Sequence, residues 1–198
     1  LIFTLQKSVS IVEYTYIMSI SRQNLSAIIV SFKSDHVIHR CISSIDKEIE
    51  IIVIENSNNT KLKKNIEEQY ENVKCILSPE NIGMGAGNNI GIKNTNKDFA
   101  LILNPDVILE KNTIDEIIGA SKSLDSFGVI APISDKLKYP NYKLDKNKNH
   151  KFDPINPFEV KTVDGYSMLL NLKRLRKLNN FNFFDENFFL YLENDDFC

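Results

Sequence analysis

Short apolar runs rich in β-branched residues alternate with amphipathic segments over the first two thirds of the chain. Five such runs predict buried strands, at 26–32, 50–54, 73–77, 99–103 and 128–131. Apolar residues recur at helical spacing between them, with Ser34, Asp35 and Asn112 as expected N-caps. This alternation predicts right-handed βαβ units, and therefore an α/β domain with a Rossmann-like, mostly parallel central sheet flanked by helices.

The rhythm breaks at 132–159, which predicts a loop or an irregular insertion before another strand at 166–172. This segment contains four prolines and a set of lysines, at 136, 138, 143, 146, 148 and 151. A solvated loop accounts for such a composition. Contact with an anionic lipid surface or a lipid-linked acceptor is the sharper hypothesis.

Length and composition narrow the class of protein. The 198 residues suit one domain, and the net charge of −2 gives no footprint for nucleic acid. Three widely spaced cysteines indicate neither a disulfide framework nor a zinc site, which fits a reducing, cytoplasmic setting. No stretch is apolar for long enough to span a bilayer.

Both ends of the chain are unusual. It begins with Leu1 rather than Met, and residues 1–17 lack the features of a signal peptide, so we expect an N-terminal extension over 1–25 before a domain over 26–198. Cys198 follows an acidic cluster with no helix stop signal. We therefore expect the domain to be incomplete at its C-terminus.

Polar residues follow two of the predicted strands at the points where those strands end. Glu55 begins one such turn, and Asn104-Pro105-Asp106 forms the other. Ligands of open α/β sheets bind outside the carboxyl ends of the strands. Each segment alone could be a simple turn, but carboxylates at neighbouring strand ends favour a site.

A glycine-rich segment at 81–91 lies where a helix should connect two strands. It contains four glycines, each costing about 1 kcal/mol in a helix relative to alanine. The pattern matches neither the dinucleotide fingerprint nor a phosphate-binding P-loop. It indicates either close approach of a ligand to the backbone or tight packing of a helix on the sheet.

Acidic residues gather near the C-terminus, after an aromatic and apolar run. Glu193, Asp195 and Asp196 could form a solvated helix start or could hold a general base. His36 and His39 lie one turn apart on a predicted helix. We interpret them as exposed positions rather than as metal ligands, because no third ligand is near in the sequence.

Four blocks in order resemble the family 2 glycosyltransferases, which have the GT-A fold, and look closest to their rhamnosyltransferase-like branch. The blocks are IIVIENSN at 51–58, NIGMGAGNNIG at 81–91, LILNPDV at 101–107, and the segment 163–198. The second is similar to the family's glycine and asparagine block, and the third to its version of the DXD motif.

The resemblance implies roles for individual residues. Glu55 would contact the nucleoside, where the family has a shorter aspartate. Asp106 would bind Mg²⁺ or Mn²⁺, and Asn104 replaces the first acid of the DXD motif. Further donor-binding residues are implied at Asn81, Gly83, Gly87, Asn89 and Gly165.

The base position of the last block holds Asn194, an amide that cannot accept the acceptor's proton. The candidate bases are therefore its neighbours. Glu193 is favoured by its reach and by the apolar run before it, followed by Asp196, with Asp195 or no base as the remaining alternatives.

The resemblance implies metal-dependent transfer of a sugar, with inversion, from a nucleotide-diphosphate sugar to a glycan or lipid-linked acceptor. The expected context is bacterial surface polysaccharide synthesis. A non-catalytic nucleotide-sugar-binding domain is the first alternative. A sugar-phosphate nucleotidyltransferase is the second, although the loop at 33–36 has no glycine.

Overall fold

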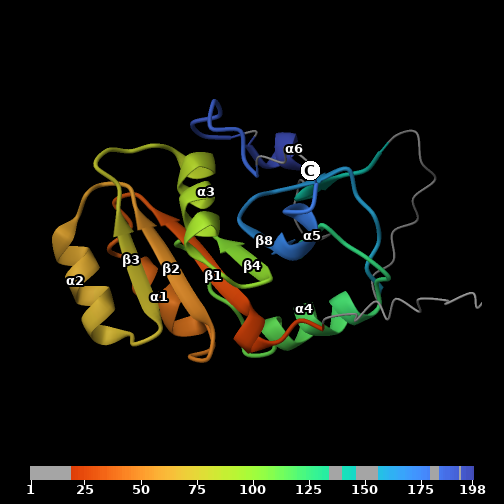
Figure 1. Ribbon diagram of the computed structural model, residues 1–198, viewed down its shortest axis with the longest axis horizontal. Helices are drawn as coiled ribbons and strands as arrows, with labels where there is room; N and C mark the ends of the chain where they lie inside the picture. The colour runs from red at the N-terminus through yellow and green to blue at the C-terminus, as the bar shows by residue number, and fades with distance from the viewer. Residues whose placement is uncertain (1–18, 134–139, 146–155, 179–182, 192) are drawn as a thin grey trace, which may run out of the picture.

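The computed structural model describes residues 19–133, 140–145, 156–178, 183–191 and 193–198 (Figure 1). Most of the predicted N-terminal extension, residues 1–18, lies outside these ranges. The folded part begins before the predicted boundary at residue 26. Ile20 is buried, a 3-10 helix spans Arg22–Asn24, and the first strand starts at Leu25.

The described chain forms a six-stranded sheet in the order β3-β2-β1-β4-β8-β5. The strands are β1 (Leu25–Ser31), β2 (Glu50–Glu55), β3 (Val73–Leu77), β4 (Phe99–Leu103), β5 (Val129–Ile130) and β8 (Ser167–Asn171). The first four pair in parallel, whereas β8 pairs antiparallel with both β4 and β5. The predicted α/β class with a mostly parallel sheet is confirmed.

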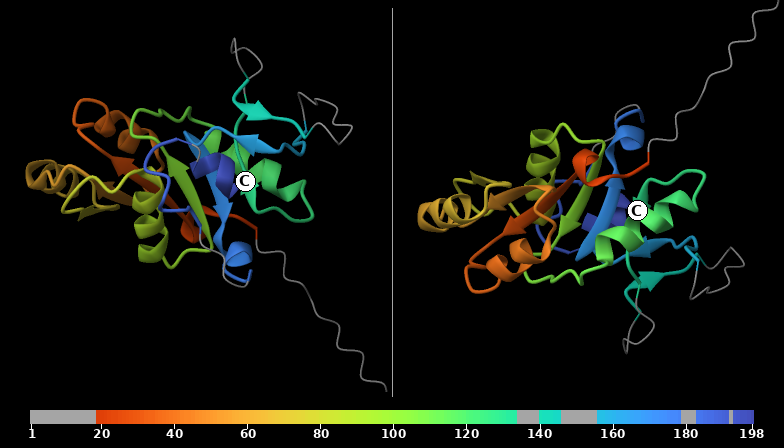
Figure 2. Two further views of the ribbon diagram at one scale, coloured as in Figure 1. Left: turned by 90° about the horizontal axis from the view of Figure 1, so that it is seen from above. Right: turned by 90° about the horizontal axis from the view of Figure 1, so that it is seen from below.

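Helices cover both faces of this sheet (Figures 1 and 2). They are α1 (Ile38–Ser44), α2 (Thr60–Gln69), α3 (Met84–Asn94), α4 (Thr113–Lys122), α5 (Leu172–Leu175) and α6 (Glu193–Phe197). Side chains of α1, α2 and α4 pack in one apolar cluster, and those of α3 and α5 pack in clusters on the opposite face.

The alternation of side chains along each strand explains why apolar clusters form on both faces of the sheet. Ala27 and Ile29 of β1 belong to the cluster with α1, whereas Ile28 and Val30 face α3. Successive strand side chains point to opposite faces, and both faces are covered. The central strands are therefore apolar at nearly every position, which is the signal that predicted them.

The helix after β1 starts later than predicted, because residues 34–37 form a turn. The Ser34 carbonyl accepts hydrogen bonds from the backbone N–H groups of Val37 and Ile38, both at 3.0 Å. The Ser34 hydroxyl instead donates to the Phe32 carbonyl, and no side chain caps α1. The Asn112 side chain likewise does not cap α4.

The irregular segment at 132–159 contributes one short strand. Within the described part of this segment, β6 (Tyr142–Lys143) pairs antiparallel with β7 (Thr162–Val163) to form a separate two-stranded sheet. This small sheet contacts α6. It thereby joins the lysine-rich segment to the acidic C-terminal helix.

Candidate functional site

Glu55, at the carboxyl end of β2, is a fully buried carboxylate that organises its own turn. Its two oxygens accept the Ser57 N–H, each at 3.1 Å, and one also accepts the Ser57 hydroxyl at 2.5 Å. The Asn59 N–H donates to the other oxygen at 2.5 Å. Glu55 therefore shapes the loop at this edge, where the sequence predicted a nucleoside contact.

Asn56 connects this loop to the glycine-rich segment. Its buried amide donates to the Gly83 carbonyl at 3.0 Å and to Asn81 Oδ1 at 3.4 Å. Asn81 in turn accepts the Gly83 N–H at 3.1 Å. The two loops after β2 and β3 are thus joined at one point, through a residue to which the sequence had assigned no role.

The glycine-rich segment forms α3, and its glycines meet protein atoms. A Cβ built on Gly87 would lie 2.8 Å from Val30 Cγ1, and one on Gly91 would lie 2.3 Å from Ile28 Cγ2. Such distances are too short for a side chain in a packed interior. These two glycines therefore allow α3 to lie directly on β1, which supports the packing explanation of the segment.

Gly83 precedes α3 with a φ of 85° and faces the C-terminal segment. A Cβ there would lie 2.3 Å from the Phe189 carbonyl oxygen. That oxygen accepts the Met84 N–H at 3.2 Å, so the first turn of α3 is capped from within the protein. Gly83 therefore makes room for the backbone of Phe189, whereas the resemblance implied that this residue contacts the nucleotide-sugar donor.

Asn89 also holds the C-terminal segment. Its side chain is buried, donates to the Phe184 carbonyl at 2.8 Å and accepts the Phe184 N–H at 3.0 Å. A further bond reaches Glu186 Oε1 at 3.0 Å. Of the predicted donor-binding residues, Gly83, Gly87 and Asn89 thus make internal contacts that position α3 and the segment after it.

The turn after β4 presents Asp106 at the carboxyl edge. Asp106 is exposed, Asn104 is half-buried, and the Val107 N–H bonds to the Asn104 carbonyl at 3.1 Å. The Cys41 thiol also donates to that carbonyl, at 3.6 Å. Burial, together with the negative charge of Asp106, raises the pKa of Cys41 to about 12, so this thiol stays protonated.

Contacts of the segment that precedes β8 connect this turn to the acidic helix. The Asn104 N–H donates to the Tyr166 carbonyl at 3.0 Å, and Gly165 packs against Asn194, whose Cβ would lie 3.2 Å from a Cβ on that glycine. The Asn194 amide donates to the Val163 carbonyl at 2.6 Å. The DXD-like turn, Gly165 and the acidic cluster are therefore connected by direct contacts.

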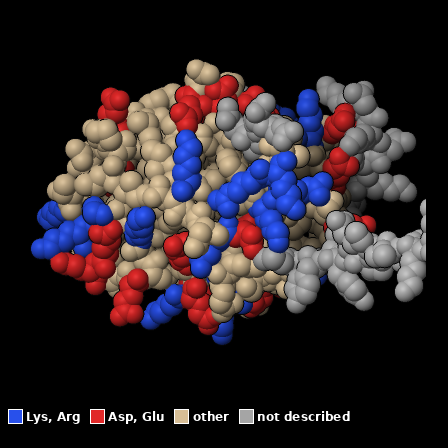
Figure 3. All heavy atoms as spheres, in the orientation of Figure 1, with Lys and Arg blue, Asp and Glu red and all other residues tan. Residues whose placement is uncertain are grey.

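The three acids of α6 differ in their surroundings. Asp195 accepts a hydrogen bond from Lys143 Nζ at 2.6 Å, and this bond lowers the pKa of Asp195. Glu193 Oε2 is buried and has no hydrogen-bond partner among the described residues, and Asp196 is exposed. Figure 3 shows acidic side chains at the upper edge of the molecule, on the side where α6 lies in Figure 1. The pairing of Asp195 leaves Glu193 and Asp196 as the candidate bases.

The predicted lysine loop is described at one position. Lys143 lies in β6 and forms the ion pair with Asp195. The other five lysines of the loop lie outside the described residues. The structure therefore gives Lys143 a role inside the fold, and the membrane contact predicted for the loop stays a prediction.

The described residues contain no group of three or more His, Cys, Asp or Glu side chains that could hold a metal. Asp106 supplies one exposed carboxylate. Mg²⁺ and related hard cations are commonly bound by one or two carboxylates together with substrate phosphates. Asp106 fits a cation of this kind only as part of a site that the ligand completes.

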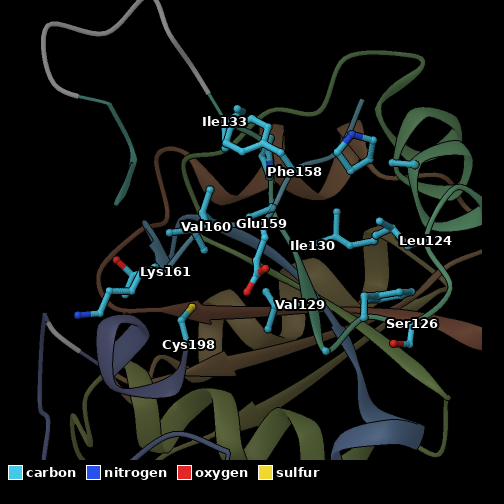
Figure 4. Close-up of a pocket in the computed structure, with 18 of the residues that line it drawn as sticks. Leu124, Ser126, Val129, Ile130, Ile133, Phe158, Glu159, Val160, Lys161 and Cys198 are labelled. Atoms are coloured by element: carbon cyan, nitrogen blue, oxygen red, sulfur yellow. The ribbon is translucent and has the colours of Figure 1, made fainter. Parts of the chain in front are cut away.

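A cavity of about 980 Å³ lies between α4, β5 and the segment 156–163, and Phe197 and Cys198 also line it. Figure 4 shows Val129, Ile130, Glu159 and Cys198 around it. None of the predicted site residues lines this cavity. We therefore assign the candidate site to the carboxyl edge, where the polar loops meet.

A four-stranded parallel core, extended by antiparallel β8 and joined at its carboxyl edge by α6, matches the architecture of the GT-A glycosyltransferases. The chain belongs to the family described as Glycosyl transferase family 2, whose model matches residues 26–191. The predicted family is confirmed.

Individual relatives agree with this assignment. The chain is 28% identical over 191 residues to the low-salt glycan biosynthesis hexosyltransferase Agl10 of Haloferax volcanii, covering 88% of this chain and 60% of that protein. It resembles S. aureus TarS 1–349 in complex with UDP, with a TM-score of 0.62 and 18% identity over 88% of this chain and 53% of TarS 1–349.

A third likeness is to the mannosyltransferase PcManGT from Pyrobaculum calidifontis, in complex with GDP-Man and Mn²⁺. The TM-score is 0.59 and the identity 11%, over 84% of this chain and 49% of that one. The two structural likenesses establish the fold. The chain spans 60% of the length of the curated relative and about half of each of these structures.

Proposed function

We propose that this domain transfers a hexosyl or rhamnosyl group from a nucleotide-diphosphate sugar, with inversion, to a glycan or lipid-linked acceptor in surface polysaccharide synthesis. The observation that carries the proposal is the convergence of three elements at the carboxyl edge. These are the exposed Asp106 after β4, the turn at Gly165, and α6 with Glu193 and Asp196. Relatives named as a hexosyltransferase, and solved with UDP or with GDP-Man and Mn²⁺, support a nucleotide-sugar donor.

Asp106, with Asn104 beside it, would hold Mg²⁺ or Mn²⁺ together with the phosphates of the donor. When bound, such a cation neutralises the charge that develops on the departing diphosphate. Asp106 is the exposed carboxylate of the described turn after β4, so we expect cation binding to depend on the nucleotide. Three free cysteines are consistent with the cytoplasmic side of a membrane, where we place the reaction.

Glu193 is the base that we favour. Its carboxylate would take the proton from the acceptor hydroxyl, while that oxygen attacks the anomeric carbon and the bond to the diphosphate breaks. The attack comes from the face opposite the leaving group, so the product is inverted. Glu193 Oε2 is buried and finds no hydrogen-bond partner in the part of the chain that the structure describes, which supports this role over Asp195, which is bonded to Lys143.

Asp106→Asn tests the donor site. We expect calorimetry of the wild-type protein with a nucleoside diphosphate to show binding only when Mn²⁺ is present, and the variant to lose that dependence while keeping its melting temperature. Asp125→Asn, an exposed change after α4, is the matched control. Unchanged Mn²⁺-dependent affinity in Asp106→Asn would remove Asp106 from the site.

Glu193→Gln tests whether Glu193 acts in sugar transfer rather than in binding of the donor. We expect transfer to fall by roughly two or more orders of magnitude while donor affinity is kept, because the amide cannot accept a proton. Asp195→Asn serves as a comparison from the same helix, and Asp196→Asn tests the second candidate. If the wild-type protein binds donor but neither transfers nor hydrolyses it, the non-catalytic binding domain is the correct alternative.

A further inference from the structure

Basic side chains gather over α5, on the face of the sheet that α3 covers. Leu172 and Leu175 of this short helix are buried, while the cations around them are exposed, except for the half-buried Lys97. Figure 3 shows the resulting blue group at the middle of the molecule, over the position of α5 in Figure 1. We call it the α5 basic surface, and it consists of Lys93, Lys97, Lys173, Arg174, Arg176 and Lys177.

Arg176 fixes the α5 basic surface to the end of α3. Its guanidinium donates to the carbonyls of Ile92 at 3.2 Å, Thr95 at 3.3 Å and Lys97 at 3.3 Å. Basic groups at a helix C-terminus satisfy the last carbonyls and suit the helix dipole. Residues distant in the sequence are thereby held together, and the surface is formed before any partner arrives.

Positive charge is concentrated along the chain at this surface. Lys63 and Lys64 of α2 share their helix with the acids that they pair with, Glu67 and Glu68. On the α5 basic surface, four of the six cations come from the stretch 173–177, which contains no acid, and Lys93 lies 4.0 Å from Glu186. The whole chain has a net charge of −2, so the positive charge is a local concentration.

An apolar side chain lies at the edge of this surface. Leu178 directly follows the basic run, and 51% of it is exposed. Lysine and arginine combined with an exposed leucine suit a boundary that has anionic groups outside and apolar groups beneath. A polyanion would contact the cations but would leave Leu178 without an apolar partner.

We propose that the α5 basic surface binds the surface of a bilayer that contains anionic phospholipids. This goes beyond the proposed sugar transfer and does not depend on it. The surface lies near the amino end of β4, where the Lys173 N–H bonds to the Asp98 carbonyl at 3.1 Å. The candidate site lies at the carboxyl end of the same strand, so a bilayer bound here would leave that site uncovered.

Co-sedimentation with vesicles tests the proposal. Vesicles of phosphatidylcholine with phosphatidylglycerol should pellet the protein at low salt, vesicles of phosphatidylcholine alone should not, and added salt should weaken binding. The triple variant Lys173→Gln, Arg174→Gln, Lys177→Gln should bind on the order of 100-fold more weakly, given the attraction of each cation to an anionic surface. Arg176 is left intact because it holds the surface together.

The matched control removes the same charge from another face, through Lys47→Gln, Lys61→Gln and Lys64→Gln. This variant should bind within a few-fold of the wild-type protein, and Leu178→Ser should weaken binding without changing its salt dependence. Equal loss in the two triple variants would overturn the proposal, because net charge alone would then explain binding. Retention on heparin beads without binding to vesicles would also overturn it, in favour of a polyanion.

Discussion

Gly87 shows at the scale of one residue how the packing of α3 depends on a missing side chain. The helix carries Gly85, Gly87 and Gly91, although glycine lowers helix stability. The destabilising effect of Gly87 on the helix is offset by its close contact with Val30, since no larger residue fits between the helix and β1. The helix can therefore lie close to the sheet, and the loop before it reaches the carboxyl edge.

Gly87→Ala should lower the free energy of unfolding by about 1–3 kcal/mol, because the new Cβ overlaps the Val30 methyl groups. Denaturant unfolding measures this change. Gly119→Ala is the control, because a Cβ there meets nothing within 4 Å. It should stabilise α4 by roughly 0.5–1 kcal/mol.

The double variant Gly87→Ala, Val30→Ala should recover part of the loss, since the two residues are in contact. If Gly87→Ala instead keeps its stability and loses affinity for a nucleoside diphosphate, the glycine serves ligand approach and the packing explanation fails.

At the scale of elements, the sequence predicted the strands that are marked by runs of buried apolar residues. The run at 50–54 became β2 nearly as expected, because Ile51 to Ile54 are buried on both faces. The sequence could not predict that β8 runs antiparallel to its neighbours, since an apolar run indicates a strand but not its partner. The early start predicted for α1 failed because the Ser34 and Asp35 side chains bond elsewhere, to Phe32 and Asn59.

The candidate site was less accessible to sequence reasoning than the strands were. Glu55 and Asp106 lie at the carboxyl edge, as their positions after strands implied, and Gly165 lies near it because β8 runs antiparallel to β4. The contacts of Asn89 with Phe184 join residues 95 apart, and no local pattern reports such a pair. Asn56 was missed for the same reason, because its partner Gly83 belongs to another loop.

Helix α6 gives a prediction about pH. Lys143 lowers the pKa of Asp195, so the ion pair favours the docked helix above the ordinary aspartate range and is lost as pH falls through the lowered pKa. Lys143→Gln should raise the pKa of Asp195, as measured by NMR titration. It should also speed amide exchange in α6 at neutral pH.

The difference in exchange between Lys143→Gln and wild type should vanish in acid, where Asp195 is protonated in both proteins. Lys47→Gln, on a distant turn, should change neither quantity. An unaltered Asp195 titration in Lys143→Gln would mean that the pair does not form in solution.

The whole molecule consists of a central sheet onto which a C-terminal segment is fastened at a few points. The segment 183–198 meets the rest of the fold through Asn89, through the start of α3, and through the small sheet of β6 and β7. The stacked rings of Phe184 and Phe197, 4.7 Å apart, join its two ends. We therefore expect the segment to detach as one unit if these contacts are lost.

Asn89→Ala should open this segment without unfolding the sheet. The Phe184 N–H and carbonyl would lose their partners, a cost of about 1–3 kcal/mol each when they stay buried. Hydrogen exchange should show protection falling across 183–198 and little change in β1 or β4. Asn94→Ala, an exposed change on the same helix, is the control, and uniform loss of protection across the fold would contradict this division.

The bond from Asn89 to Phe184 has a consequence for how the protein is made. The ribosome completes β1, β2, β3 and β4 some eighty residues before Phe184 is synthesised. The parallel core can thus gather while the rest of the chain is still being translated. Throughout that interval the polar groups of Asn89 face solvent, and the acidic helix has not yet been made. The nascent domain can assemble its parallel core early, but the contacts that fix the segment after Phe184 against α3 form only once that segment has left the exit tunnel.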